Sequence, residues 1–186
     1  MYKLTSATVQ PSHRAALSFF GLILLQGFHE TEHIVQIVQR FILHDPTGAG
    51  ILGSWVDIEP VHLAYNGVFL GLIALCFWVG GFWRNLAQHH PVVVGLMSFA
   101  LFFETYHFLE HVVKMAQFFE TGTNGTPGLL GQFVNLVWLH FTYNTIAYIP
   151  LLIVFFVDGY YTSAMSNFST PLFRIGKGTS VIKVGC

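Results

Sequence analysis

Residues 28–34 read FHETEHI and place two histidines and two glutamates inside an apolar region. The flanking segments, AALSFFGLILLQG (15–27) and VQIVQRFIL (35–43), are largely hydrophobic. Because a charged side chain near the centre of a bilayer costs about 3 kcal/mol or more, ionisable groups in such a segment need partners. The stretch therefore predicts either a soluble helix or a membrane helix whose polar side chains are held by other groups.

The composition favours the membrane. Hydrophobic residues make up 53% of the 186 residues and charged residues 9%, whereas soluble domains carry about 25% charged residues. Residues 61–83 and 132–157 contain no Asp, Glu, Lys or Arg, and each run exceeds the roughly 20 residues that cross a bilayer. We therefore expect an all-α integral membrane protein with four transmembrane helices, at residues 13–43, 59–83, 91–119 and 132–160.

The basic residues predict the orientation in the membrane. They gather near the N-terminus, between the second and third predicted helices, and in the tail, at Lys3, Arg14, Arg84, Arg174, Lys177 and Lys183. Since basic residues favour the cytoplasmic side, we expect both termini, including a polar tail at 161–186, in the cytoplasm. The loops around 44–58 and 120–132 would then face outward. The net charge of −1 gives no indication of a nucleic-acid partner.

A second segment, YHFLEHV (106–112), repeats the first at an offset of 78 residues. Between residues 29–66 and 107–144, 13 of 38 aligned positions are identical. The identical pairs include His29 and His107, Glu32 and Glu110, His33 and His111, Gln39 and Gln117, Gly50 and Gly128, His62 and His140, and Asn66 and Asn144. This pattern predicts a tandem duplication of a two-helix hairpin in one membrane domain, with repeat 1 near 13–83 and repeat 2 near 91–160.

Duplicated hairpins share one orientation, so matched residues are expected at the same depth. Residues three or four apart are neighbours on a helix, which places His29, Glu32 and His33 on one face. Clusters of ionisable groups inside a membrane indicate function. We therefore predict a layer of metal ligands toward the outer face, comprising His29, Glu32, His33, His62, His107, Glu110, His111 and His140. Asn66 and Asn144 are expected to hydrogen-bond the site or a bound oxygen species.

These ligand types favour a transition metal, namely iron, copper or zinc. Six histidines and two glutamates suffice for two ions. Haem or chlorophyll is the alternative cofactor, because histidine also serves as an axial ligand. However, two histidines one helical turn apart lie only about 6 Å from each other, which is too close for each to hold its own macrocycle.

Two Glu-x-x-His spacings, at 104–107 and 59–62, resemble those of di-iron bundles. Their glutamates are replaced by Gln26 and Val137 in the other copy. Because they break the repeat, these spacings receive little weight as ligands.

The expected function is that of a metal-dependent oxidoreductase or a redox subunit in the bilayer, with electrons or substrate arriving from lipid or from the outer face. A quinol or another hydrophobic molecule and further membrane subunits are the expected partners. Two alternatives stay open. HETEH matches the zinc-protease pattern H-E-x-x-H with Glu30 as base, although Phe108 replaces Glu30 in the second copy. The chain could also be a non-enzymatic subunit of a larger complex, whose polar groups only pair helices.

Overall fold

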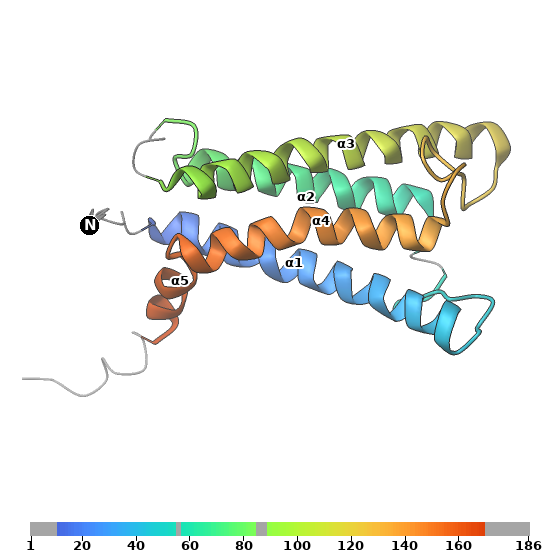
Figure 1. Cartoon of the computed structure of the whole chain (residues 1–186), viewed down its shortest axis with the longest axis horizontal. Helices are drawn as coiled ribbons and strands as arrows, with labels where there is room; N and C mark the ends of the chain where they lie inside the picture. The colour runs from blue at the N-terminus through green and yellow to red at the C-terminus, as the bar shows by residue number, and fades with distance from the viewer. Residues whose placement is uncertain (1–10, 55–56, 85–88, 170–186) are drawn as a thin grey trace, which may run out of the picture.

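The computed structural model describes residues 11–54, 57–84 and 89–169, and all regular structure within these ranges is helical. The helices are α1 (His13–Ile37), the short π-helix η1 (Val38–Ile42), α2 (Glu59–Val79), α3 (Pro91–Thr121), α4 (Leu136–Val157) and α5 (Tyr160–Ser169) (Figure 1). Lys3, Arg174, Lys177 and Lys183, which helped to predict the orientation, lie outside the described residues. The orientation in the membrane therefore stays a prediction.

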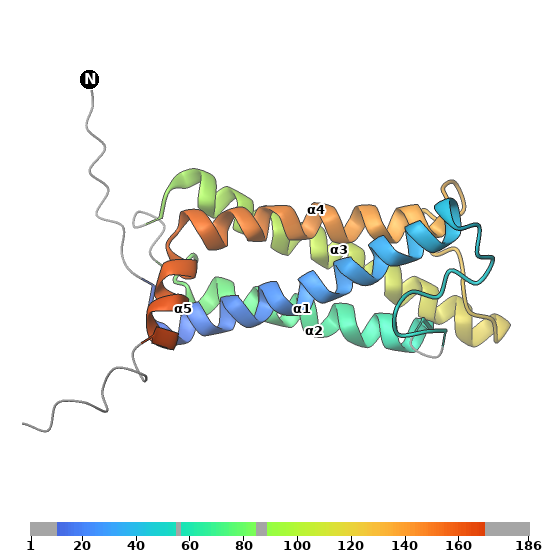
Figure 2. The same cartoon turned by 90° about the horizontal axis from the view of Figure 1, so that it is seen from below.

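Helices α1 to α4 lie side by side in an elongated bundle (Figures 1 and 2). The connections from α1 to α2 and from α3 to α4 lie at the same end of the bundle, which we call the loop end. The connection from α2 to α3 and the short helix α5 lie at the opposite end. Helices α2 and α4 each pack against both α1 and α3, so all four helices surround one interior.

Three of these helices, α2, α3 and α4, are long and apolar enough to cross a membrane. Helix α1 has 25 residues but is not among them, since Arg14, Glu30 and Glu32 make it more polar. The described part of the chain is therefore all-helical and contains three helices that can span a membrane.

Local sequence explains where the helices begin and end. Pro60 lies in the first turn of α2, where its missing N–H group costs no hydrogen bond. Helix α3 ends at Gly122, whose φ of 69° is the left-handed conformation that glycine adopts most easily. Helix α4 begins at Leu136 rather than at residue 132, because the Asn135 side chain accepts hydrogen bonds from two amides of the first turn.

The beginning of the predicted polar tail is helical. Helix α5 packs against α1 and α4, and its first residue, Tyr160, is 1% exposed. The Tyr160 ring lies 4.6 Å from the Phe19 ring, measured between centroids. Residues 160–169 therefore close the end of the bundle opposite the loops.

The interior of the bundle divides into an apolar half and a polar half. Next to α5 the buried side chains are apolar and include Phe19, Leu22, Phe69, Ile73, Met97 and Leu151. Toward the loop end most of them are polar, although Leu139 and Tyr143 are also buried there; the polar ones include Gln26, His29, Glu30, Glu32, His33, Gln36, Glu59, Asn66, Glu104, His107, Glu110, His111, Lys114, His140 and Asn144. Polar groups within apolar helices thus face one another instead of lipid, as the cost of exposing them there requires.

Candidate metal centre

Six imidazoles gather in the polar half of the bundle. His29 and His33 come from α1, His62 from α2, His107 and His111 from α3, and His140 from α4. The rings form a continuous series of contacts with centroid separations between 4.5 Å (His29 to His33) and 6.2 Å (His33 to His62). Four different helices therefore supply one cluster of rings.

Helices α1 and α3 contribute the same pair geometry. The Nε2 atoms of His29 and His33 lie 3.2 Å apart, and those of His107 and His111 also lie 3.2 Å apart. With metal–nitrogen bonds of 2.0–2.1 Å, two nitrogens on one tetrahedral ion are separated by about 3.3 Å. Each pair is therefore spaced like two ligands of a single ion.

The outer nitrogen of one ring in each pair faces a hydrogen-bond acceptor. His33 Nδ1 lies 2.8 Å from Gln36 Oε1, and His107 Nδ1 lies 3.2 Å from Glu104 Oε2. Both partners are oxygens, which can accept a proton from Nδ1 in the tautomer that carries its proton there. The Nε2 atom of each ring then keeps its lone pair, in the arrangement that orients ligating histidines in metal proteins.

A carboxylate joins the histidines at the start of α2. Glu59, His62 and His111 each offer a ligand atom, and these atoms lie within 4.8 Å of one another. Glu59 Oε2 is 3.9 Å from His111 Nδ1, too far for a hydrogen bond. Ligands of one ion lie between about 3 Å and 4 Å apart when metal–ligand bonds are 2.0–2.1 Å. We call Glu59, His62 and His111 the ligand triad.

Two atoms of the ligand triad are buried without a hydrogen bond. Glu59 Oε2 and His111 Nδ1 have no hydrogen-bond partner in the described part of the chain. An unsatisfied buried polar atom costs about 1–3 kcal/mol. A cation between them would accept both lone pairs, so the donor set of two nitrogens and one oxygen fits a transition metal such as zinc or iron.

Lys114 brings a positive charge to the same place. Its side chain is 1% exposed, and Nζ lies 2.9 Å from Glu59 Oε1 and 3.1 Å from His140 Nε2. The Lys114 ammonium group has no lone pair, so it donates the hydrogen bond to His140 and the Nε2 atom of His140 accepts it. The lysine therefore neutralises the triad carboxylate and connects the triad to the fourth helix.

The two glutamates predicted as ligands contact the loops. Glu32 Oε1 accepts a hydrogen bond from the amide of Leu52 at 3.1 Å. Glu110 Oε1 accepts from the amides of Leu129 and Leu130 at 2.8 Å and 3.0 Å. Their Oε2 atoms are buried and lack a partner among the described residues. Neither carboxylate belongs to a three-residue ligand group in the part of the chain that the structure describes.

Further loop contacts also recur at the 78-residue offset. Gln39 exchanges two hydrogen bonds with the backbone of Gly50, and Gln117 exchanges the same two with Gly128. Both glycines have positive φ, at 78° and 67°. A Cβ atom on either would overlap the carboxylate oxygen of Glu32 or Glu110. Glycine is therefore required at both turns.

The two predicted asparagines bond to their own helices. The side chain of Asn66 donates to the carbonyl of His62 at 2.8 Å, and that of Asn144 donates to the carbonyl of His140 at 2.9 Å. Asn144 Oδ1 also accepts from Gln26 Nε2 at 2.7 Å. Both asparagines thus lie one turn below a cluster histidine, on the side of the cluster away from the loops.

Glu30, the general base of the protease alternative, lies apart from the ligand triad. Its Oε1 accepts a hydrogen bond from the Thr145 hydroxyl on α4. The residue therefore faces the contact between α1 and α4, and the geometry does not support the protease reading.

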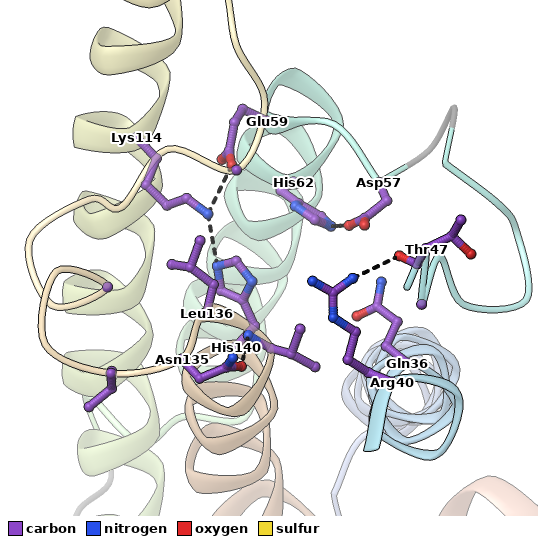
Figure 3. Close-up of a pocket in the computed structure, with 15 residues that line it drawn as sticks. Gln36, Arg40, Thr47, Asp57, Glu59, His62, Lys114, Asn135, Leu136 and His140 are labelled. Carbon is purple, nitrogen blue, oxygen red and sulfur yellow. Dashed lines mark hydrogen bonds and ion pairs between the residues drawn. The ribbon is translucent and has the colours of Figure 1, made fainter. Parts of the chain in front are cut away.

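A cavity of about 450 Å³ adjoins the ligand triad at the loop end. Figure 3 shows Lys114, Glu59 and His140 on one side of it and Asp57 and Arg40 on the other. Asp57 Oδ1 lies 3.4 Å from His62 Nε2. Burial raises the pKa of the Asp57 carboxyl, while a hydrogen bond from Gln36 and the charge of Lys114 oppose that shift. The triad therefore has a polar approach from the loop side.

A haem group fits this cluster poorly. A macrocycle lies between its two axial imidazoles, but the rings of His111 and His140 are stacked with centroids 5.2 Å apart and an interplanar angle of 17°. The rings of His62 and His140 are 5.6 Å apart. The histidines fill the space that the macrocycle would need.

Sequence reasoning missed two residues of this centre, Gln36 and Lys114, and gave little weight to two others, Glu59 and Glu104. Each lies three residues from a cluster histidine on the same helix, at the i, i+3 spacing of neighbours on one face. Repeat matching hid them because each is replaced by a different residue in the other copy. The helical spacing identified Glu59 and Glu104, and it could also have identified Gln36 and Lys114.

Comparisons of the chain with protein-family models, curated protein sequences and solved structures gave no match.

Proposed function

We propose that this chain is a membrane-embedded, histidine-rich metal-binding protein that acts as an oxidoreductase or a redox subunit. The observation that carries the proposal is the ligand triad of Glu59, His62 and His111, whose ligand atoms lie within 4.8 Å of one another. The buried, unpartnered Glu59 Oε2 and His111 Nδ1 support it further, since a bound cation would satisfy both atoms.

The donor types narrow the choice of metal. A carboxylate beside imidazoles suits iron or zinc better than copper(I), which prefers softer donors. The His29 and His33 pair, with Nε2 atoms 3.2 Å apart, supports a second ion beside the first. The surroundings of this pair differ from those of the triad, because Gln36 occupies the position in repeat 1 that Lys114 occupies in repeat 2. We therefore propose two ions in unlike environments.

The chain's own residues would prepare this site. Gln36 and Glu104 would accept the Nδ1 protons of His33 and His107, which would leave the Nε2 nitrogens free to bind. A bound metal would supply Lewis acidity or an electron-transfer step. Burial of the cluster limits the access of water, and Lys114 balances the charge of Glu59.

A small apolar cavity supports contact with a hydrophobic partner. Its volume is about 60 Å³, and its lining includes Phe28, His29, Val61, His62 and Tyr65. Phe28 is 50% exposed on the outside of the bundle. A quinol or a similar molecule in the lipid could approach the two cluster histidines most closely at this face, which suits electron transfer to the site.

We also propose that the chain is a tandem duplication and that it crosses the membrane four times. Hydrogen bonds that recur 78 residues apart support the duplication, as with Glu32 to Leu52 and Glu110 to Leu130. If α1 is the fourth span, its glutamates are stabilised by the loops and by α4. The basic residues favour cytoplasmic termini, which would put the metal centre near the outer face.

The test is a metal and spectral analysis of the protein purified in detergent. We expect about one to two equivalents of iron, copper or zinc and no intense haem or pigment band. Glu59→Gln should lose metal, whereas Glu30→Gln, a matched change on α1, should not. Oxidation of a short-chain quinol by the metal-loaded protein would establish the redox role. Protein that contains neither metal nor chromophore would instead be a structural subunit.

A further inference from the structure

The cavity at the loop end carries charges that metal binding does not require. Its volume of about 450 Å³ lies within the usual range of small-molecule pockets. The charged and polar residues that line it are Gln36, Arg40, Asp57, Glu59, His62, Lys114, Asn135 and His140. The cavity is therefore larger and more highly charged than a passage for a metal ion needs to be.

Arg40 projects into this cavity from η1, the π-helical extension of α1 (Figure 3). Its Nη1 atom donates to the carbonyls of Pro46 and Thr47, and the Thr47 hydroxyl donates to Asp45 at 2.7 Å. The turn thus holds the guanidinium group in place. Single π-helical turns are found frequently at functional sites, and Phe118 at the matched position in α3 lacks the charge.

The charge balance around the cavity becomes positive once the site is loaded. A divalent ion contributes two positive charges, and Arg40 and Lys114 contribute one each, against one negative charge each from Asp57 and Glu59. Two positive charges remain. The first turns of α2 and α4 also border the cavity at Glu59 and Leu136, and helix N-termini carry partial positive charge.

We propose that this cavity binds a small anion, a carboxylate or oxyanion, that reaches the metal from the loop side. Arg40 recognises the anion and Lys114 supplies the second positive charge; the inference rests on the proposed metal site. Lys114 pairs with Glu59 at 2.9 Å. A metal on Glu59 compensates that carboxylate, so the lysine becomes available to the anion.

The experiment uses the full-length protein in detergent micelles, loaded with Co²⁺ as a spectroscopic probe. Formate is titrated while the visible spectrum of Co²⁺ is recorded, and formamide serves as the uncharged control. We expect a saturable change with formate and none with formamide. Arg40→Gln should weaken apparent formate binding about 10-fold or more, as the loss of a charged hydrogen-bond donor does.

Arg84→Gln is the matched control. The Arg84 guanidinium stacks over the Trp78 ring at 5.2 Å, at the end of α2 away from the loops, so this variant should bind formate like the wild type. Because Arg40 also holds the turn at Pro46, Lys114→Gln is the second variant, and it too should weaken formate binding. Melting temperature and Co²⁺ content show which variants are folded and loaded.

Each outcome has a separate meaning. Unchanged formate affinity in a folded, loaded Arg40 or Lys114 variant overturns the anion site while leaving the metal site intact. An equal response to formamide does the same. Failure of the wild type to bind Co²⁺ overturns the proposed metal site and the anion site with it.

Discussion

Lys114 Nζ lies 2.9 Å from Glu59 Oε1, and both side chains are buried between α2 and α3. The lysine also donates to His140 at 3.1 Å. A buried carboxylate and a buried ammonium group stabilise each other, and removing either one leaves an uncompensated buried charge. A bound metal ion could replace the ammonium group as the partner of the carboxylate. Removing Lys114 and removing Glu59 should therefore have different consequences with and without metal.

We expect Glu59→Gln to weaken metal binding about 10-fold or more, since it removes an anionic ligand. Metal content after dialysis against a weak chelator measures the effect. Glu30→Gln should retain its metal, because Glu30 bonds to Thr145 and lies outside the ligand triad. If instead Glu30→Gln lost activity with its metal in place while Glu59→Gln behaved like the wild type, the protease reading would be restored.

Lys114→Met should destabilise the metal-free protein strongly. It leaves Glu59 buried without a partner, and breaking a buried ion pair costs about 3–5 kcal/mol. Saturating Zn²⁺ should restore most of the lost stability, because the metal compensates the carboxylate. Melting temperatures in detergent with and without Zn²⁺ test this, with the exposed Arg84→Met as control. An unchanged melting temperature for the metal-free Lys114→Met variant would contradict the expected role of the pair.

If the Nε2 atoms of His107 and His111, 3.2 Å apart, hold an ion, Glu104→Leu should weaken its binding about 10- to 100-fold, as loss of the acceptor that orients a ligating histidine does. Glu104→Gln should be much milder, because its side-chain oxygen can still accept the proton from His107 Nδ1. Titration with Co²⁺, followed by the visible spectrum, compares the two variants. Equal affinities in both would show that Glu104 does not orient the ring.

Glu110→Gln should lower the melting temperature with little change in metal content. The carboxylate accepts hydrogen bonds from Leu129 and Leu130, and hydrogen bonds to a charged group contribute about 1.5–3 kcal/mol. Glu32→Gln should act in the same direction but less, because Glu32 bonds a single loop amide, that of Leu52. Loss of metal at unchanged stability would instead support the sequence-based prediction that these glutamates are ligands.

The sequence alone determined the helical class and which histidines gather. Apolar runs of at least about 20 residues predict membrane helices, and in the described part of the chain three helices, α2, α3 and α4, are long and apolar enough to span a membrane. The matched positions of His29, His33, His62, His107, His111 and His140 predicted one cluster, because equal helix spacing in two like hairpins puts equal side chains at one depth. Their rings are in contact.

Only the tertiary structure decided which acid joins the histidines. Repeat matching favoured Glu32 and Glu110, yet both bond loop amides, whereas the unmatched Glu59 lies with His62 and His111. Matching the two repeats identifies only the residues that both copies share. The charges at the site depend instead on which side chains of different helices face each other. Glu59 lies in the first hairpin and Lys114 in the second, and neither is matched by the same residue in the other copy. They form a pair only because α2 packs against α3.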